Sequence, residues 1–340
     1  MIAPMSAGRL LFRCAIDFDR AIDSNDEFLV PFARVVPLLR NRGIEFDPVR
    51  GDVEFVDSNV GPSSSEHPMV LFDRADGAAL WWRYQPRKHV ARGILESPRT
   101  LGLVKISKYR SCRFYNQLGA EGCHHIALCG DPDRDRRNGE PQLPDISESA
   151  FSRIRLGAGY WAFDQCVPLA EKGDGIVFGR RDFDVFCALS VSYASPDISR
   201  HRELALDRLA DLRGLRSVLG RGRIFPREQF HELLGRARIC VSPWGWGETC
   251  IRDYEALLAG CVLIKPRTDF IDSAFPLTER QYVACEPDFS DLSERVRQVL
   301  DNWSTYADRA LALRHEVLRA RDPNTIAEVY AAALRASMPL

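Results

Sequence analysis

The stretch "CVSPWGWGETCIRDYEALLAGCVLIKP", residues 240–266, decides the fold class of this chain. An apolar strand that begins at Arg238 ends in Ser-Pro, and a glycine-rich turn with two tryptophans follows it. Residues 249–260 then have the apolar spacing of a helix, and residues 261–266 form a second apolar strand. A strand, a crossover helix and another strand are typical of a parallel sheet. The sequence therefore predicts an α/β fold.

The same alternation extends over most of the chain. We predict further helices at residues 26–43, 199–214, 227–237 and 291–303, and further strands at residues 9–17, 69–77, 101–109, 123–130 and 183–193. Pro31 and Pro37 are expected to break or kink the first of these helices. The polar segment "AEKGDG" separates two halves of similar pattern. We predict domains at residues 1–172 and 173–323, with residues 324–340 as a final helix that can cross back to the first domain.

Composition and charge exclude several classes of protein. Among 340 residues, 46 are Lys or Arg and 47 are Asp or Glu, so the chain lacks the basic surplus that binds nucleic acid. The 10 cysteines have no zinc or redox spacing, and we expect reduced thiols that behave as small apolar side chains. No signal peptide and no apolar run of about 20 residues is present. We expect a cytoplasmic protein with at most peripheral membrane contact.

The turn after the strand at residues 238–243 has the features of an anion site. Gly245 and Gly247 permit close approach of the backbone, and Thr249 is expected to be the N-cap of the next helix. The free N–H groups at that helix start favour an anion such as a diphosphate. Arg252 adds charge-assisted hydrogen bonds, and Glu255 shares its helix face and can accept both hydroxyls of a ribose. The alternative interpretation is an ordinary turn followed by a surface ion pair.

These features follow a fixed order: Ser-Pro at Ser242, the glycine-rich turn, Arg252, the string "YEAL" and, after Gly260, an apolar strand that ends near a proline. This order resembles the donor-binding segment of GT-B glycosyltransferases, most closely the exostosin-like and group 1 enzymes. The resemblance implies two Rossmann-like domains that face a cleft, each a parallel sheet with helices on both faces. It covers about residues 184–330. It also implies that Glu255 binds the ribose of a nucleotide-sugar.

One departure from the family pattern concerns the spacing of two glutamates. Many retaining group 1 enzymes have seven residues between them, whereas Glu248 and Glu255 have 6 between them. The exostosin-like form, with the second glutamate alone, fits this chain better. The stereochemical outcome of the reaction is therefore left open.

Further donor contacts are expected from residues around this segment. Trp244 and Trp246 either stack on a base or sugar, or brace the turn against the other domain. The leaving diphosphate needs positive charge, for which the candidates besides Arg252 are Arg200 and Lys265. Arg180 and Arg181 are alternatives, and a solvated helix face is the competing interpretation for Arg200.

An inverting transferase also needs a base for the proton of the acceptor. We expect it at a strand end of the first domain, where Asp17 and Asp73 are the candidates. Their neighbours Asp19 and Asp76 follow the same strands. The competing interpretation for each is a turn or capping residue.

The resulting functional hypothesis is a glycosyltransferase, hexosyl or related, that moves a sugar from a nucleotide-sugar to a glycan, a lipid-linked acceptor or a small molecule. The nucleotide-sugar is its donor substrate, and no metal or other cofactor is expected in this architecture. The alternatives are a sugar-nucleotide epimerase of the same architecture and a non-catalytic nucleotide-sugar-binding protein. The sequence does not favour a dehydrogenase, because no Gly-x-Gly-x-x-Gly follows a strand with an acidic residue at the required distance.

Overall fold

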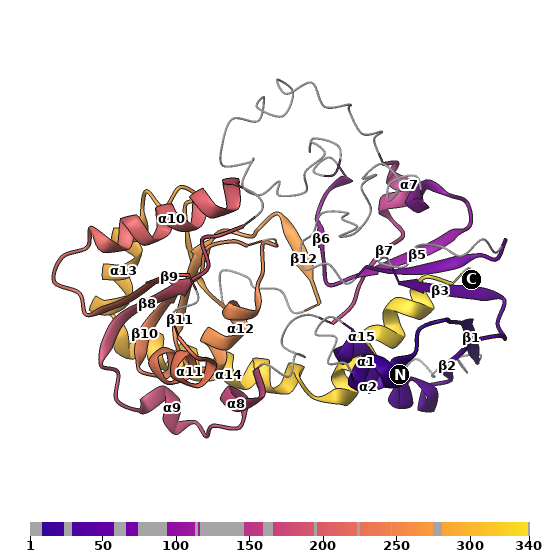
Figure 1. Cartoon of the computed structure of the whole chain (residues 1–340), viewed down its shortest axis with the longest axis horizontal. Coiled ribbons are helices and arrows are strands. Elements are labelled where there is room, and N and C mark those ends of the chain that lie inside the picture. The colour runs from indigo at the N-terminus through magenta and orange to yellow at the C-terminus, as the bar shows by residue number, and fades with distance from the viewer. Residues whose placement is uncertain are drawn as a thin grey trace, which may run out of the picture.

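The computed structural model of the chain describes residues 9–23, 29–57, 66–73, 94–112, 115, 146–158, 166–193, 196–222, 225–245, 247–274 and 281–338. The start of the helix predicted at residues 26–43, the predictions for Asp76 and Trp246, and the strand predicted at residues 123–130 lie outside these residues. The described part of the chain forms two α/β lobes side by side (Figure 1).

The first lobe contains a 6-stranded sheet in the order β2-β1-β3-β4-β5-β7, in which all pairs are parallel. Its strands are β1 (Leu10–Arg13), β2 (Ile44–Asp47), β3 (Val53–Asp57), β4 (Met69–Asp73), β5 (Thr100–Lys105) and β7 (Ile154–Leu156). Its helices are α1 (Phe18–Asp23), α2 (Val30–Asn41) and α7 (Glu148–Phe151). The order of the first strands reverses between β1 and β3, which makes the carboxyl ends of these two strands the switch point of this sheet.

Aromatic packing holds α2 against this sheet. Phe32 of α2 stacks on Phe55 of β3 at 5.2 Å between ring centroids and contacts Phe72 of β4 at 5.1 Å. Of the predicted break or kink, the break does not occur, since α2 continues through Pro37 with its apolar face buried along its length. Pro31 lies in the first turn, where a backbone N–H has no helical partner in any case.

The second lobe contains a 5-stranded parallel sheet in the order β13-β11-β10-β8-β9. Its strands are β8 (Phe183–Leu189), β9 (Ser217–Arg221), β10 (Ala237–Val241), β11 (Val262–Pro266) and β13 (Val283–Cys285). Its helices are α8 (Val167–Ala170), α9 (Gly175–Phe178), α10 (Pro196–Ala210), α11 (Arg227–Gly235), α12 (Ile251–Leu258), α13 (Leu292–Asp301) and α14 (Trp303–Ala320).

Helices cover both faces of the second sheet because its strands are apolar on both sides. Val185 and Ile239 face one way and pack with residues of α10 and α13. Phe186 and Cys240, their neighbours in the chain, face the other way and pack with residues of α11 and α12. The prediction of an α/β fold with two parallel sheets and helices on both faces is confirmed.

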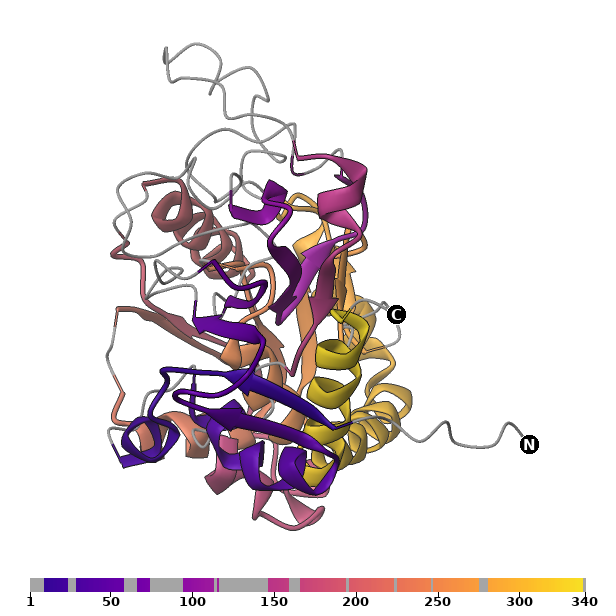
Figure 2. The same ribbon diagram turned by 90° about the vertical axis from the view of Figure 1, so that its right-hand side faces the viewer.

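Among the described residues, a C-terminal helix and a pair of short strands join the lobes. Helix α15 (Pro323–Ala336) follows the second lobe in the chain but lies against α2, β5 and β7 of the first lobe (Figure 2). Gly157 permits this approach, since a Cβ there would lie 2.8 Å from the ring of Tyr330. In addition, β6 (Ser107–Tyr109) pairs antiparallel with β12 (Ile271–Ser273), which follows β11.

The strand predicted at residues 101–109 therefore divides at Ile106 into β5 and β6, which belong to different sheets.

Candidate functional site

The candidate site lies at the carboxyl ends of β8 and β10 in the second sheet. The strand order of this sheet reverses between β8 and β10, and such switch points are where open α/β sheets bind ligands. Tyr193 follows β8, and Ser242 to Gly245 follow β10 directly. Helices α10 and α12 begin at the same edge, so their N-termini point toward this region.

Glu255 is the residue that the sequence resemblance predicts to bind the ribose. It lies on α12 and is 6% exposed, but its surroundings are basic. Its Oε1 atom lies 3.1 Å from Nε2 of His231 and 3.5 Å from a guanidinium nitrogen of Arg227, both on α11. Its Oε2 atom makes no hydrogen bond to any residue that the structure describes. The carboxylate is thus held on one side and keeps one oxygen for another partner.

Two arginines converge near the glycine turn without a carboxylate between them. Arg202 of α10 is 4% exposed, and its guanidinium hydrogen-bonds the hydroxyl of Tyr193. Arg252 of α12 lies close enough that its charge acts on Arg202, and its guanidinium lies 5.6 Å from the ring centroid of Phe230. Neither arginine forms an ion pair with a described residue, and the Nε atom of each is buried without a hydrogen-bond partner among these residues.

The position of Arg202 is electrostatically unfavourable for a cation in the absence of an anion. Burial, and next the charge of Arg252, lower the pKa of Arg202. A guanidinium stays charged in proteins, so the unfavourable energy is relieved only by a negative partner. A Cβ built on Gly245 would lie 3.4 Å from a guanidinium nitrogen of Arg202, which places the backbone of the turn beside that cation. The group of residues fits a phosphate or diphosphate.

The turn itself is fixed by a buried charged pair. Asp253 of α12 accepts hydrogen bonds from the Ser242 hydroxyl at 2.6 Å and from the backbone N–H of Cys250 at 3.0 Å. Lys265 of β11 donates to Asp253 and, at 2.7 Å, to the carbonyl oxygen of Glu248. Lys265 is 1% exposed, so its ammonium group lies within this network.

The predicted N-cap is corrected by these contacts. Cys250, one residue after Thr249, is the N-cap of α12, because Asp253 binds the backbone N–H at position 250. Thr249 is 1% exposed, and its hydroxyl has no hydrogen-bond partner among the described residues. The residue therefore lies inside the turn.

Trp244 is part of the core. It is 1% exposed and stacks on His201 of α10 with 5.2 Å between centroids and 12° between planes. Its other neighbour is Phe270, at 6.1 Å and close to perpendicular. Trp244 thus braces the turn between α10 and the segment before β12. Gly247 accepts a hydrogen bond from the N–H of Gly245 at 3.2 Å.

The remaining arginine candidates lie elsewhere. Arg200 is exposed on α10, two residues before Arg202. Arg181 donates to four backbone carbonyls, those of Gly235, Ala237, Ala259 and Gly260.

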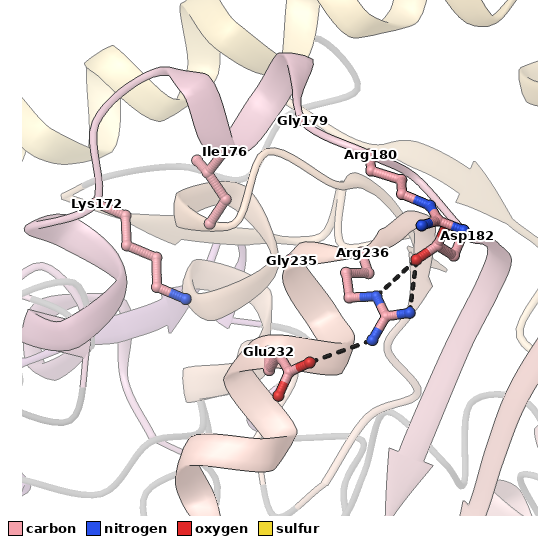
Figure 3. Close-up of a pocket in the computed structure, with 8 residues that line it drawn as sticks. All are labelled: Lys172, Ile176, Gly179, Arg180, Asp182, Glu232, Gly235 and Arg236. Atoms are coloured by element: carbon pink, nitrogen blue, oxygen red, sulfur yellow. Dashed lines mark hydrogen bonds and ion pairs between the residues drawn. The ribbon is translucent and has the colours of Figure 1, made fainter.

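Arg180 lines a separate pocket of about 450 Å³ with Asp182, Glu232 and Arg236 (Figure 3). Arg236 pairs there with Asp182 at 2.6 Å and with Glu232 at 3.2 Å. Asp182 and Arg236 directly precede β8 and β10, so this pocket is at the amino ends of the strands, opposite to the candidate site.

The two candidate bases have different surroundings. Asp17 is exposed after β1, and its carboxylate accepts a hydrogen bond from the N–H of Arg20 at 2.9 Å, as a helix cap does. Asp19 is exposed in the first turn of α1. Asp73 ends β4, is 4% exposed, and pairs with Lys105 of β5 at 2.5 Å. Both candidates thus lie at the carboxyl edge of the first sheet.

Sequence reasoning missed Arg202, His231 and Arg227. A signal for Arg202 exists, because it is four residues after Ile198 and four before Leu206, both on the buried stripe of α10. His231 and Arg227 share one face of α11 through their spacing, but only the packing of α11 against α12 brings them to Glu255. No local pattern contains that contact.

No helix of the described segments is long and apolar enough to cross a bilayer. No three His, Cys, Asp or Glu side chains within the described ranges are grouped so that they could hold a metal ion.

The sequence matches no protein-family model and no curated protein. Solved structures that resemble the chain include a glycosyltransferase from Rickettsia africae, with 9% identity, a TM-score of 0.47, and coverage of 97% of this chain and 99% of that chain. Anabaena HepE in complex with UDP-glucose has 12% identity and a TM-score of 0.43, and the match covers 80% and 73% of the two chains. An α,α-trehalose 6-phosphate synthase from Burkholderia multivorans has 11% identity and a TM-score of 0.46, with 92% and 75% covered. Because each TM-score is below 0.5, we base the function on the residues of this chain.

Proposed function

We propose that this protein is a glycosyltransferase that takes its sugar from a nucleoside diphosphate-sugar. The observation that carries the proposal is Arg202, which is buried beside Gly245 and close enough to Arg252 for the two charges to interact, while neither arginine forms an ion pair with a described carboxylate. A diphosphate supplies the missing negative charge and accepts hydrogen bonds from both guanidinium groups.

Glu255 extends this site from the diphosphate to the nucleoside. It follows Arg252 by three residues and therefore lies on the same face of α12. His231 and Arg227 orient its Oε1, and its Oε2 accepts from a hydroxyl of the ribose. Because His231 and Arg227 already hold the carboxylate, it is pre-organised for the ligand, and less conformational entropy is lost on binding.

The arginines also have a chemical role. When the sugar leaves the donor, negative charge develops on the diphosphate oxygen, and fixed cations in a water-poor site stabilise that charge. Arg202 and Arg252 supply two such cations from the chain itself. This is the basis for proposing transfer without a metal.

For the base we favour Asp17 over Asp73. Asp73 is buried in an ion pair with Lys105, whereas Asp17 is exposed at the switch point of the first sheet. In an inverting reaction Asp17 takes the proton of the acceptor hydroxyl while that oxygen attacks the sugar. The Asp73–Lys105 pair then supports the strand ends next to it. The acceptor is a glycan, a lipid-linked molecule or a small molecule with a free hydroxyl.

The test is product analysis with UDP-, GDP-, dTDP- and ADP-sugars, each with and without candidate acceptors. Nucleoside diphosphate released together with a glycosylated acceptor supports the proposal. Interconversion of the sugar without an acceptor identifies an epimerase, and a raised melting temperature without any turnover identifies a binding protein. Either result contradicts a transferase.

A matched pair of variants tests the diphosphate site. Arg202→Met removes the buried cation, and Arg200→Met removes an exposed one from the same helix. We expect the first variant to lose about tenfold or more in donor affinity, by loss of charge-assisted hydrogen bonds, and the second to bind as the wild type does. Equal affinities of the two variants would contradict the placement of the diphosphate beside Arg202.

A further inference from the structure

The buried Asp253–Lys265 pair has no role in the mechanism above. Both side chains are almost fully inaccessible, at 0% and 1% exposure. Burying two charges is unfavourable, and a buried pair often adds no net stability compared with apolar residues of the same size. Such pairs are retained in some proteins because they select one conformation. The contacts of this pair indicate which conformation is selected here.

The pair contacts both ends of the glycine turn, whose described residues are 242–245 and 247–250. At the start of the turn, Asp253 accepts from the hydroxyl of Ser242. At its end, Asp253 accepts from the N–H of Cys250, and Lys265 donates to the carbonyl of Glu248. The two side chains come from α12 and β11, which the sheet core holds rigidly. They therefore fix the separation of the two ends of the turn.

The same contacts bear on the role of Lys265. Its ammonium has three donor hydrogens, and Asp253 and the Glu248 carbonyl use two of them. With its side chain 1% exposed, Lys265 cannot extend to a ligand on the outer side of the turn. The contacts of its ammonium group with described residues are those to Asp253 and to the carbonyl oxygen of Glu248, which belong to the scaffold of the turn.

We propose that Asp253 and Lys265 are positioning residues, which act on the donor only by holding the glycine turn in the form that places Gly245 beside Arg202. The proposal rests on the proposed function for the identity of the donor. Its structural part, that the pair holds the turn, stands without any ligand. The alternative is that Lys265 binds the donor phosphate directly.

Hydrogen–deuterium exchange of the ligand-free protein tests the structural part. In Asp253→Asn and Lys265→Met the amides of residues 247–253 should exchange about tenfold faster or more, because the turn loses anchors at both ends. Ser242→Ala, which removes one hydrogen bond and no charge, should show a smaller increase. Asp184→Asn is the control, since Asp184 pairs with Arg216 at the amino end of the same sheet. Unchanged exchange in residues 247–253 of all three turn variants would overturn the proposal.

A double-variant cycle tests the connection to the donor, with UDP and GDP as probes in calorimetric titrations. Each single variant leaves one buried charge without its partner, whereas Asp253→Asn combined with Lys265→Met leaves neither. We expect each single variant to bind about tenfold more weakly, and the double variant to bind better than either single variant. If Lys265 contacts phosphate, the double variant binds no better than Lys265→Met, and that result overturns the positioning role.

The two proposals fail in different ways. If the wild type binds no nucleotide, the proposed function fails, while the exchange measurement still reports on the turn. If the wild type binds UDP or GDP and the exchange of residues 247–253 is unchanged in all three turn variants, only the positioning role fails. Melting temperatures of all variants, compared with Asp184→Asn, separate loosening of the turn from loss of the whole fold.

Discussion

Side chains with shifted protonation equilibria lie throughout the core of this protein, and the cysteines show it most clearly. Cys14, Cys166 and Cys187 are buried, and burial raises the pKa of each thiol to about 12. All the cysteines of the described segments are free thiols. At neutral pH these groups are protonated, and the thiol is a poor nucleophile compared with the thiolate.

We therefore expect iodoacetamide at pH 8 to leave these three residues unmodified in the native protein and to modify them after unfolding, as measured by peptide mass spectrometry. The pKa values also predict a pH effect. The pKa of Cys14 in the folded protein lies above the ordinary value of 9.0, so the thiol loses its proton more easily in the unfolded chain. Its contribution to the free energy of unfolding is therefore fully present below about pH 9 and is lost as the pH rises toward 12. Rapid native labelling of Cys187 would show that its core position is wrong.

The glycine turn is the element on which the site depends. An added methyl group at position 245 would lie 3.4 Å from Arg202 and 3.9 Å from the hydroxyl of Tyr193. It fits beside the protein atoms but occupies space next to the cation where we place a phosphate. Gly245→Ala should thus keep the melting temperature of the wild type and weaken UDP or GDP binding, and Gly245→Val should weaken it further. Wild-type affinity in both variants would contradict this placement.

Elements with strong local signals could be predicted from the sequence. The β10, α12 and β11 unit follows from an apolar run, a helical repeat and glycines at the boundaries, and it places Arg252 and Glu255 on one helix face. The strands β2 and β9 were not predicted, because they are short edge strands with few fully buried residues. The strands β3, β7, β12 and β13 were not predicted either, although β3 is buried along its whole length.

The contacts that complete the site could not be predicted in the same way. His231 reaches Glu255 through the packing of two helices, and the pairing of β6 with β12 joins segments more than 150 residues apart.

At the scale of the molecule, the lobes are joined by contacts that span nearly the whole chain. The hydroxyl of Tyr109, from β6, donates to the carboxylate of Glu248 in the glycine turn at 3.1 Å. Arg110 pairs with Asp272 of β12 at 2.9 Å. Helix α15 adds Tyr330, which is 2% exposed and packs on Phe32 at 4.8 Å between centroids. The first lobe therefore depends on the C-terminal helix for part of its core.

This dependence predicts a large loss of stability in Tyr330→Ala. Removing a buried aromatic side chain costs about 3 kcal/mol or more. Tyr306→Ala, at a half-buried position on α14, is the matched control and should lose less. Urea unfolding followed by circular dichroism measures both. Equal losses in the two variants would show that α15 does not contribute to the core of the first lobe.

The central claim is that Glu255 grips the ribose of a nucleoside diphosphate, and calorimetric titration of UDP and GDP tests it most directly. The account predicts that the wild type binds at least one of them and that Glu255→Gln binds it about tenfold more weakly or worse, because a charged acceptor is lost. Glu232→Gln, which changes an exposed glutamate of α11, should bind as the wild type does. Equal affinity of Glu255→Gln and the wild type, or no binding by a folded wild type, would contradict the account.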